Sequence, residues 1–74
     1  MSDPEKMAKA CALANENEPM AKEAERTNDP SAWARLAARY VSEADAWEAA
    51  GHRDFADKTR SLARNARLKA GSPT

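Results

Sequence analysis

Three large aromatic side chains recur at seven-residue intervals in an alanine-rich part of this chain: Trp33, Tyr40 and Trp47. They are both of its tryptophans and its single tyrosine. Because two turns of an α-helix take about seven residues, this spacing places all three side chains on one helical face. We therefore expect a helix whose aromatic face forms a core or a dimer seam. The pattern constrains the architecture far more than the activity.

The length of 74 residues suits one domain, and we expect a single helical domain over residues 1–74. A chain of this size buries only about 60% of its unfolded surface and is marginally stable alone. Its one cysteine, Cys11, excludes an intrachain disulfide, and its one histidine, His52, falls short of the ligands that a structural zinc needs. We therefore expect no metal and no cofactor. Stability must come from helix packing, from a homodimer or from a larger partner.

The first helix is expected to begin within the first five residues. Ser2 and Glu5 fit the capping box S-x-x-E, and Pro4 suits the first turn, where its missing N–H costs nothing. Further along, Pro19 would clash with the carbonyl group four residues before it in a straight helix. The sequence leaves open whether Pro19 kinks this helix or breaks it, with Asn17 then capping a second segment.

The clearest helix boundary lies in the middle of the chain. Asn28 or Asp29 can cap a helix in which Pro30 takes the first position. Gly51 ends that helix by supplying a left-handed residue, and Asp54 can cap the next one. Since a short loop makes its two flanking helices antiparallel neighbours, a helical hairpin follows.

These boundaries predict an all-α fold, a small antiparallel helical bundle. We expect the hairpin over residues 30–70, an N-terminal helical element over residues 3–27 packed across it, and a frayed tail at residues 71–74. The expected seam of the hairpin's first helix is Trp33, Leu36, Ala37, Tyr40, Val41, Ala44, Trp47 and Ala50. Its polar face should carry Arg35, Arg39, Glu43, Asp45 and Glu48, with Arg39 and Glu43 spaced to pair. The expected buried face of the last helix is Phe55, Thr59, Leu62, Ala63 and Ala66.

The hairpin resembles a single tetratricopeptide repeat over residues 37–70. Residues near that family's aromatic and small positions are Tyr40, Ala44, Trp47, Gly51, Ala56 and Ala63. A second register, which excludes the first, matches Trp33, Leu36, Ala37 and Tyr40 to W-x2-L-G-x2-Y. In the first register Glu43 stands where a leucine is expected, and Arg60 where a large apolar residue is expected. The resemblance implies a helical hairpin, and arrays of such repeats bind peptides in a concave groove. Only one copy is present, and we interpret the similarity as shared packing logic rather than homology.

Charge is balanced overall but unevenly placed. Twelve basic residues match twelve acidic ones, which argues against a dedicated nucleic-acid binder. Residues 1–30 carry an excess of acids and residues 51–74 an excess of bases. Four arginines line one side of the last helix and form what we call the arginine ridge: Arg53, Arg60, Arg64 and Arg67. Such a ridge can bind phosphates or an acidic protein surface, or it can be a solvated face paired with the acidic N-terminal segment.

Catalytic motifs are missing from the sequence. His52 is interpreted as a solvated loop histidine near a helix C-terminus, where positive charge is favourable. Cys11, among alanines, is interpreted as a small buried apolar residue. No glycine-rich phosphate loop is present, since the chain has two glycines. We therefore expect no enzymatic activity.

The function predicted from these features is a small non-catalytic protein–protein interaction module, an adaptor or regulator. Its candidate contact residues are Arg53, Arg60, Arg64, Arg67, Trp33 and Trp47. One alternative is a dimeric nucleic-acid-binding regulator that uses the basic last helix, and another is an enzyme subunit without its own active site. No apolar run is long enough for a membrane span, so no membrane association is expected. The acidic, polar residues 1–5 and the lone thiol favour a cytoplasmic location.

Overall fold

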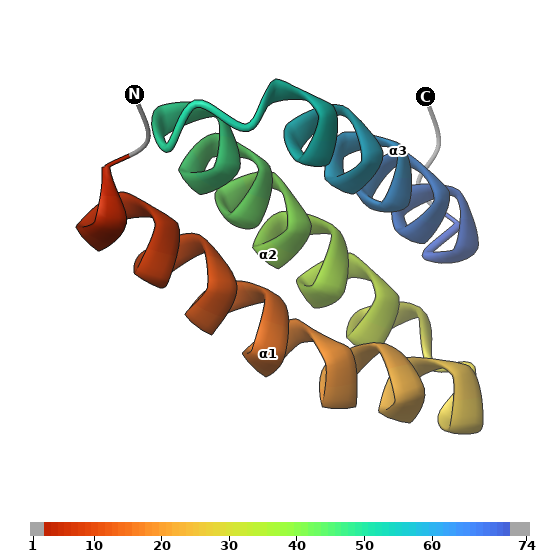
Figure 1. Cartoon of the computed structure of the whole chain (residues 1–74). Coiled ribbons are helices and arrows are strands. Elements are labelled where there is room, and N and C mark those ends of the chain that lie inside the picture. Colours follow the sequence, from red (N-terminus) through yellow and green to blue (C-terminus); the bar gives the residue numbers. More distant parts are fainter. Residues whose placement is uncertain (1–2, 72–74) are drawn as a thin grey trace.

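The computed structural model describes residues 3–71, which form three helices: α1 (Pro4–Thr27), α2 (Pro30–Ala49) and α3 (Arg53–Lys69) (Figure 1). The predicted all-α bundle is therefore confirmed. The α2–α3 hairpin lies within the predicted 30–70, and α1 supplies the third element. Ser2 and the end of the expected frayed tail (72–74) lie outside the described residues. No helix in residues 3–71 has both the length and the apolarity that a membrane crossing requires.

Helix α1 is continuous through Pro19. It therefore does not break there, and Asn17 caps no second segment. The N-cap is Asp3, whose Oδ1 accepts a 2.9 Å hydrogen bond from the backbone N–H of Glu5. Asn28 ends the helix in the left-handed region at φ 53°, and its N–H donates to the carbonyl of Ala24.

The ends of the hairpin helices follow the sequence signals in part. Asp29 caps α2, accepting a 3.0 Å bond from the N–H of Ser31, with Pro30 in the first turn. Gly51, at φ +86°, makes the predicted left-handed turn. The prediction that Asp54 caps α3 is wrong: the helix begins at Arg53, and His52 occupies the cap position without a side-chain capping bond.

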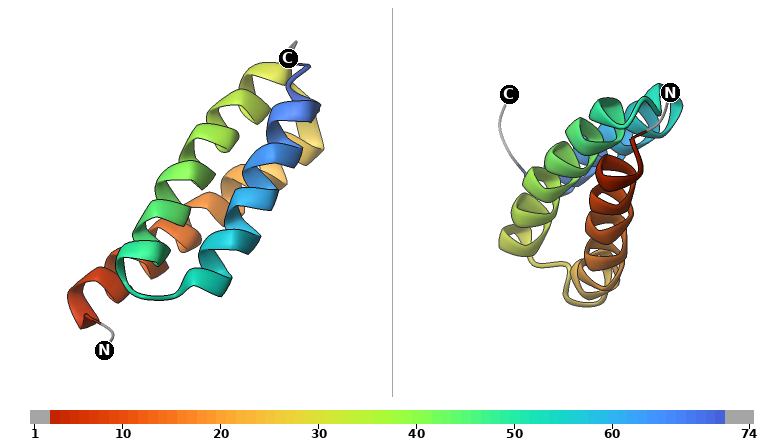
Figure 2. Two further views of the ribbon diagram at one scale, coloured as in Figure 1. Left: turned by 90° about the horizontal axis from the view of Figure 1, so that it is seen from above. Right: turned by 60° about the vertical axis from the view of Figure 1, so that its left-hand side comes forward.

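Helix α2 lies between the other two. Helices α1 and α3 each pack on α2, and their backbones do not come into contact with each other within residues 3–71. Both run antiparallel to α2 and therefore parallel to each other (Figures 1 and 2). The molecule is consequently flat, with Cα extents of 39 × 24 × 13 Å.

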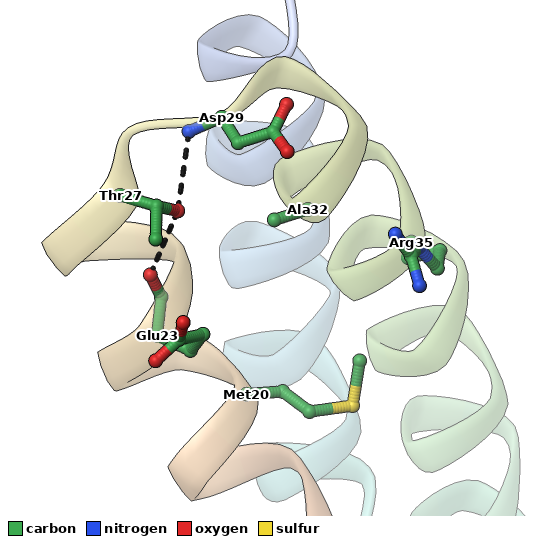
Figure 3. A pocket seen from close by; sticks show the side chains of 6 residues that line it. All are labelled: Met20, Glu23, Thr27, Asp29, Ala32 and Arg35. Carbon is green, nitrogen blue, oxygen red and sulfur yellow. Dashed lines mark hydrogen bonds between the residues drawn. The ribbon is translucent and has the colours of Figure 1, made fainter.

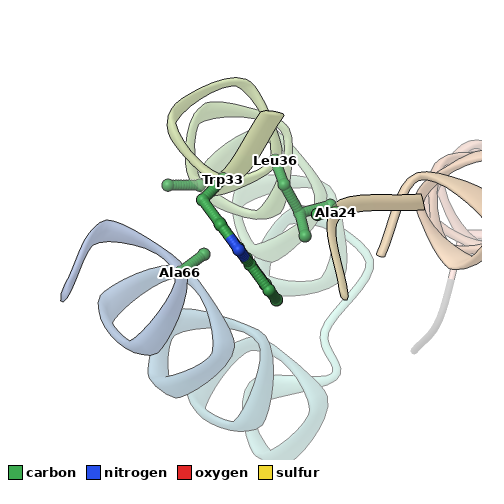
Figure 4. Close-up of a cluster of buried hydrophobic side chains, with 5 residues drawn as sticks. Ala24, Trp33, Leu36 and Ala66 are labelled. Carbon is green, nitrogen blue, oxygen red and sulfur yellow. The ribbon is translucent and has the colours of Figure 1, made fainter. Parts of the chain in front are cut away.

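The apolar core consists of two clusters, each built around one tryptophan of α2. The first contains Ala24, Trp33, Leu36, Ala37 and Ala66, and the second contains Ala10, Trp47 and Ala56. Figure 4 shows the Trp33 indole in the space between the three helices, with Ala24 and Ala66 contributed by the flanking ones. Alanines let the flanking backbones approach α2 closely, and the indoles fill the remaining space.

The predicted buried face of α3 is wrong for its two largest residues. Phe55 and Leu62 are each 47% exposed, and the buried stripe is Ala56, Thr59, Ala63 and Ala66. Val41, predicted in the seam of α2, is likewise 39% exposed. Two overlapping sets of residues on α3 have helical spacing. One has large side chains, Phe55 and Leu62, and the other has the small side chains of the buried stripe. The small stripe packs on α2, since it permits a shorter distance between the helices.

Candidate interaction surface

The tryptophans predicted to bind a partner lie inside the molecule. Trp33 and Trp47 are 6% and 8% exposed. Lys69 Nζ lies over the Trp33 ring at 4.5 Å from its centroid, and Trp33 Nε1 donates to Asn28 Oδ1 at 3.4 Å. The core alternative for the aromatic stripe therefore agrees with the structure, which exposes neither indole to a partner.

Arg60, the one partly buried member of the arginine ridge, already has acidic partners within the chain. Its guanidinium lies 2.6 Å from Glu48 and 3.4 Å from Asp45 on α2, and 3.9 Å from Asp57 on its own helix. The hydrogen bond with Glu48 is the main reason that the pKa of Arg60 is raised above its ordinary value. Arg60 thus ties α3 to α2.

The other members of the arginine ridge are exposed. No carboxylate within residues 3–71 lies at ion-pair distance from Arg53, Arg64 or Arg67. The proposed pairing of the ridge with the acidic N-terminal segment is therefore not seen, and the backbones of α3 and α1 do not come into contact. Three guanidinium groups remain available to an anionic partner.

A hollow between α2 and α3 adjoins two of these arginines, Arg64 and Arg67. It holds about 190 Å³ and is lined by Val41, Arg60, Ala63, Arg64 and Arg67. Val41 is exposed and Ala63 is buried, so the hollow combines apolar surface with a cationic rim. Sequence reasoning missed Val41 because its spacing also fits the seam of α2.

Glu43 differs more than any other residue from its predicted environment. It was predicted on the polar face of α2, but it is buried, 6% exposed, between the two apolar clusters. Its Oε1 accepts a 2.9 Å bond from Asn17 Nδ2 of α1, and its Oε2 accepts a 3.0 Å bond from Trp47 Nε1. The Thr59 hydroxyl of α3 lies 3.3 Å from Oε2 and 2.8 Å from the Phe55 carbonyl, which is the nearer acceptor for its one proton. A polar layer therefore links α1 to α2 by hydrogen bonds and lies against the Thr59 hydroxyl of α3.

The predicted pairing of Arg39 with Glu43 is also wrong. Arg39 Nε donates to Asn17 Oδ1 at 2.9 Å, and Arg39 forms an ion pair with Glu16 at 2.8 Å. The Asn17 amide thus links an exposed ion pair to the buried carboxylate of Glu43. Arg39 and Glu43 do not pair with each other because Glu16 and Asn17 of α1 bind them instead.

The structure corrects the predicted surroundings of the cysteine and of the histidine. Cys11 is exposed, which corrects its predicted burial. His52 is half-buried rather than fully solvated: its ring lies 5.8 Å from that of Trp47 and 5.7 Å from that of Phe55, and its Nε2 is buried without a hydrogen-bond partner among the described residues. Within residues 3–71 no cluster of His, Cys, Asp and Glu is arranged to hold a metal ion.

A second hollow, of about 260 Å³, lies where α1 turns into α2. Figure 3 shows the six residues that line it: Met20, Glu23, Thr27, Asp29, Ala32 and Arg35. Its polar groups belong to the helix ends, since Thr27 Oγ1 donates to the Glu23 carbonyl and accepts from the N–H of Asp29. Arg26 hydrogen-bonds Glu23 and lowers the pKa of that carboxyl. This hollow therefore holds charges of both signs, with Asp29 and Arg35 in no ion pair among residues 3–71, whereas the unpaired charges of the hollow beside the arginine ridge are all positive.

Comparison with known proteins finds no matching family model, no matching curated protein and no matching solved structure. The resemblance to a tetratricopeptide hairpin stays a prediction.

Proposed function

We propose that this protein is a small non-catalytic interaction module, an adaptor or regulator, that binds an acidic segment of a larger protein. The observation that supports this most is the hollow between α2 and α3. There, apolar surface from Val41 and Ala63 adjoins Arg64 and Arg67, whose charges no described carboxylate neutralises.

Each part of the hollow has a role in this proposal. An apolar side chain of the partner packs on Val41, which supplies affinity by removing apolar surface from water. Carboxylates beside that side chain pair with Arg64 and Arg67, whose planar guanidinium groups suit two-pronged hydrogen bonds. The charges steer the encounter more than they add to affinity. A lone thiol fits a reducing compartment, so we place the module in the cytoplasm.

An acidic protein suits this surface better than a nucleic acid does. The arginine ridge is interrupted at Arg60, where Asp45, Glu48 and Asp57 lie within ion-pair distance of its guanidinium. A phosphate backbone would meet these carboxylates along with the arginines. An acidic peptide with one apolar anchor can avoid them and still use the hollow.

Fluorescence anisotropy tests the proposal with three labelled probes: a peptide that alternates Leu with pairs of Glu, the same peptide with Gln for Glu, and a short DNA duplex. We expect binding of the Glu peptide only. Arg64→Glu with Arg67→Glu should weaken it at least tenfold, and Val41→Ser should weaken it as well.

The matched control is Lys6→Glu with Lys9→Glu, which changes the net charge equally on exposed positions of α1. It should leave peptide binding unchanged. If this control lost as much affinity for the Glu peptide, the interaction would be non-specific charge attraction. Tighter binding of the duplex, weakening steeply with salt, would favour the nucleic-acid regulator instead.

A further inference from the structure

We propose that the face between α1 and α3 binds a second copy of this chain, in a two-fold symmetric dimer. This face lies apart from the hollow that serves the proposed function, so the two proposals stand independently. Its two walls are the exposed sides of α1 and α3, and the aromatic stripe of α2 lies beneath them, with both tryptophans buried.

The wall contributed by α3 follows a seven-residue repeat: Phe55, Leu62 and Lys69. The Phe55 ring packs on Trp47 at a centroid distance of 4.9 Å, and Lys69 lies over Trp33. Leu62, midway between them on the same side of the helix, therefore lies level with Tyr40. Phe55 and Leu62 are each 47% exposed, although their neighbours on α2 are largely buried.

The wall contributed by α1 has the same period. Met7 and Ala14 pack against the Trp47 cluster and Ala21 against the Trp33 cluster. Four residues after each of these, and further toward solvent on the same side of α1, come the exposed residues Cys11, Glu18 and Glu25. Glu25 belongs to this face, because it continues the seven-residue spacing of Cys11 and Glu18 on α1.

The levels of the two walls correspond along the molecule. Ala10 and Ala56 belong to the Trp47 cluster, whereas Ala24 and Ala66 belong to the Trp33 cluster. Phe55 is consequently near the level of Cys11, and Lys69 near the level of Glu25. On α1, the Trp47 end carries Met7 and Cys11 and the Trp33 end carries Glu25. On α3, the Trp47 end carries Phe55 with the exposed Lys58 beside it, and the Trp33 end carries Lys69.

A second copy fits this pattern because α1 and α3 run parallel. A two-fold axis along the helices brings α3 of each copy against α1 of the other, in the same direction and at the same levels. Phe55 then meets the apolar end of α1 in the second copy, and Lys69 meets its Glu25. The perpendicular two-fold axis would place α3 antiparallel against α3, so that Lys69 of each copy would face the Phe55 end of the other without an acidic partner. Charge complementarity therefore selects the first arrangement.

Light scattering over a range of protein concentrations tests the dimer. We expect a mass of twice the 8.1 kDa monomer, which falls toward the monomer on dilution. Leu62→Glu should raise the dissociation constant at least tenfold with an unchanged circular dichroism spectrum. Leu68→Glu is the matched control: Leu68 is 66% exposed and lies outside the repeat of Phe55 and Leu62, so the mass should stay the same.

Charge reversal gives a second test that does not touch the apolar residues. Lys69→Glu alone should weaken the dimer, and adding Glu25→Lys should restore it, since the two charges meet across the interface. A wild-type chain that stays monomeric at millimolar concentration would overturn the proposal. So would a dimer that Leu62→Glu leaves intact, or a failure of the added Glu25→Lys to restore the dimer that Lys69→Glu weakens.

Discussion

Trp47 Nε1 donates a 3.0 Å hydrogen bond to Oε2 of Glu43, one turn before it on α2. Both side chains are buried, so the indole of the second apolar cluster is also a donor to the polar layer. The same carboxylate accepts from Asn17 of α1. One acidic side chain thus fixes the position of α1 along α2, because a shift by one turn would strand its partners.

Removing the Glu43 carboxylate should destabilise the fold strongly. Glu43→Ala leaves the Trp47 indole without an acceptor and leaves the Asn17 amide only its 3.4 Å bond to the Arg39 carbonyl, at a cost of about 1–3 kcal/mol for each N–H left unpaired. Glu43→Gln keeps one acceptor oxygen and should cost less. Urea unfolding followed by circular dichroism measures both. The exposed Glu18→Gln, which loses only an ion pair with Lys22, should change stability by about 0.5 kcal/mol or less. A Glu43→Ala variant as stable as wild type would contradict the polar layer.

Tyr40 should make stability fall in alkali. Burial raises its pKa above the ordinary 10.0, helped by the charges of Glu43 and Glu25. The folded chain then holds the phenolic proton more tightly than the unfolded chain does. This contribution is fully present below pH 10 and is lost as pH rises through the folded pKa. Tyrosinate absorbance, from the only tyrosine, should show a midpoint above 10. Tyr40→Phe should remove this part of the alkaline decline, and an identical decline in the variant would contradict the assignment.

Pro19→Ala should stabilise the protein. Pro19 lies inside α1 and is exposed, and it cannot donate to the carbonyl of Asn15. Alanine restores that donor and removes the ring clash, so we expect a gain of about 1–3 kcal/mol in the free energy of unfolding. Thermal and urea unfolding measure it. Lower stability in the variant would mean that the backbone conformation that proline imposes on α1 is needed to bring Asn17 to Glu43.

Arg60 and Arg64 should respond differently to charge reversal. Arg60→Glu places a fourth acid among Asp45, Glu48 and Asp57 and removes a link between α2 and α3, so the melting temperature should fall. Arg64→Glu removes no described ion pair and should leave it unchanged. High salt should reduce the difference in melting temperature between the two variants, since it screens the exposed charges around Arg60. Equal melting temperatures at low salt would show that the Arg60 cluster contributes nothing to folding.

Much of the fold could be predicted from the sequence, because its signals are local. Pro30 and Gly51 mark helix ends by chemistry that needs no tertiary contact. Glu43 could not be placed in the same way, since a carboxylate is normally solvated and only Asn17 and Trp47 explain its burial. Phe55 and Leu62 were misplaced because helical spacing alone does not say which of two overlapping stripes packs inward.

The candidate site was predictable only as a run of arginines. Spacing placed Arg60, Arg64 and Arg67 along one side of α3. It could not show that Arg60 is held by acids of α2, nor that Val41 adjoins the others. Both facts depend on how α2 and α3 are rotated against each other, which is a property of the packed pair.

The alanine stripe of α3 inverts the usual expectation about which residues tolerate change. Ala56 and Ala63 are buried at 0% and 5% exposure, so a larger side chain at either would force α3 away from α2. Leu68, the most exposed large apolar residue among those described, can vary with little effect on folding. In a collection of random variants that still fold, the smallest side chains of this helix should be the least replaceable, and some of its largest the most.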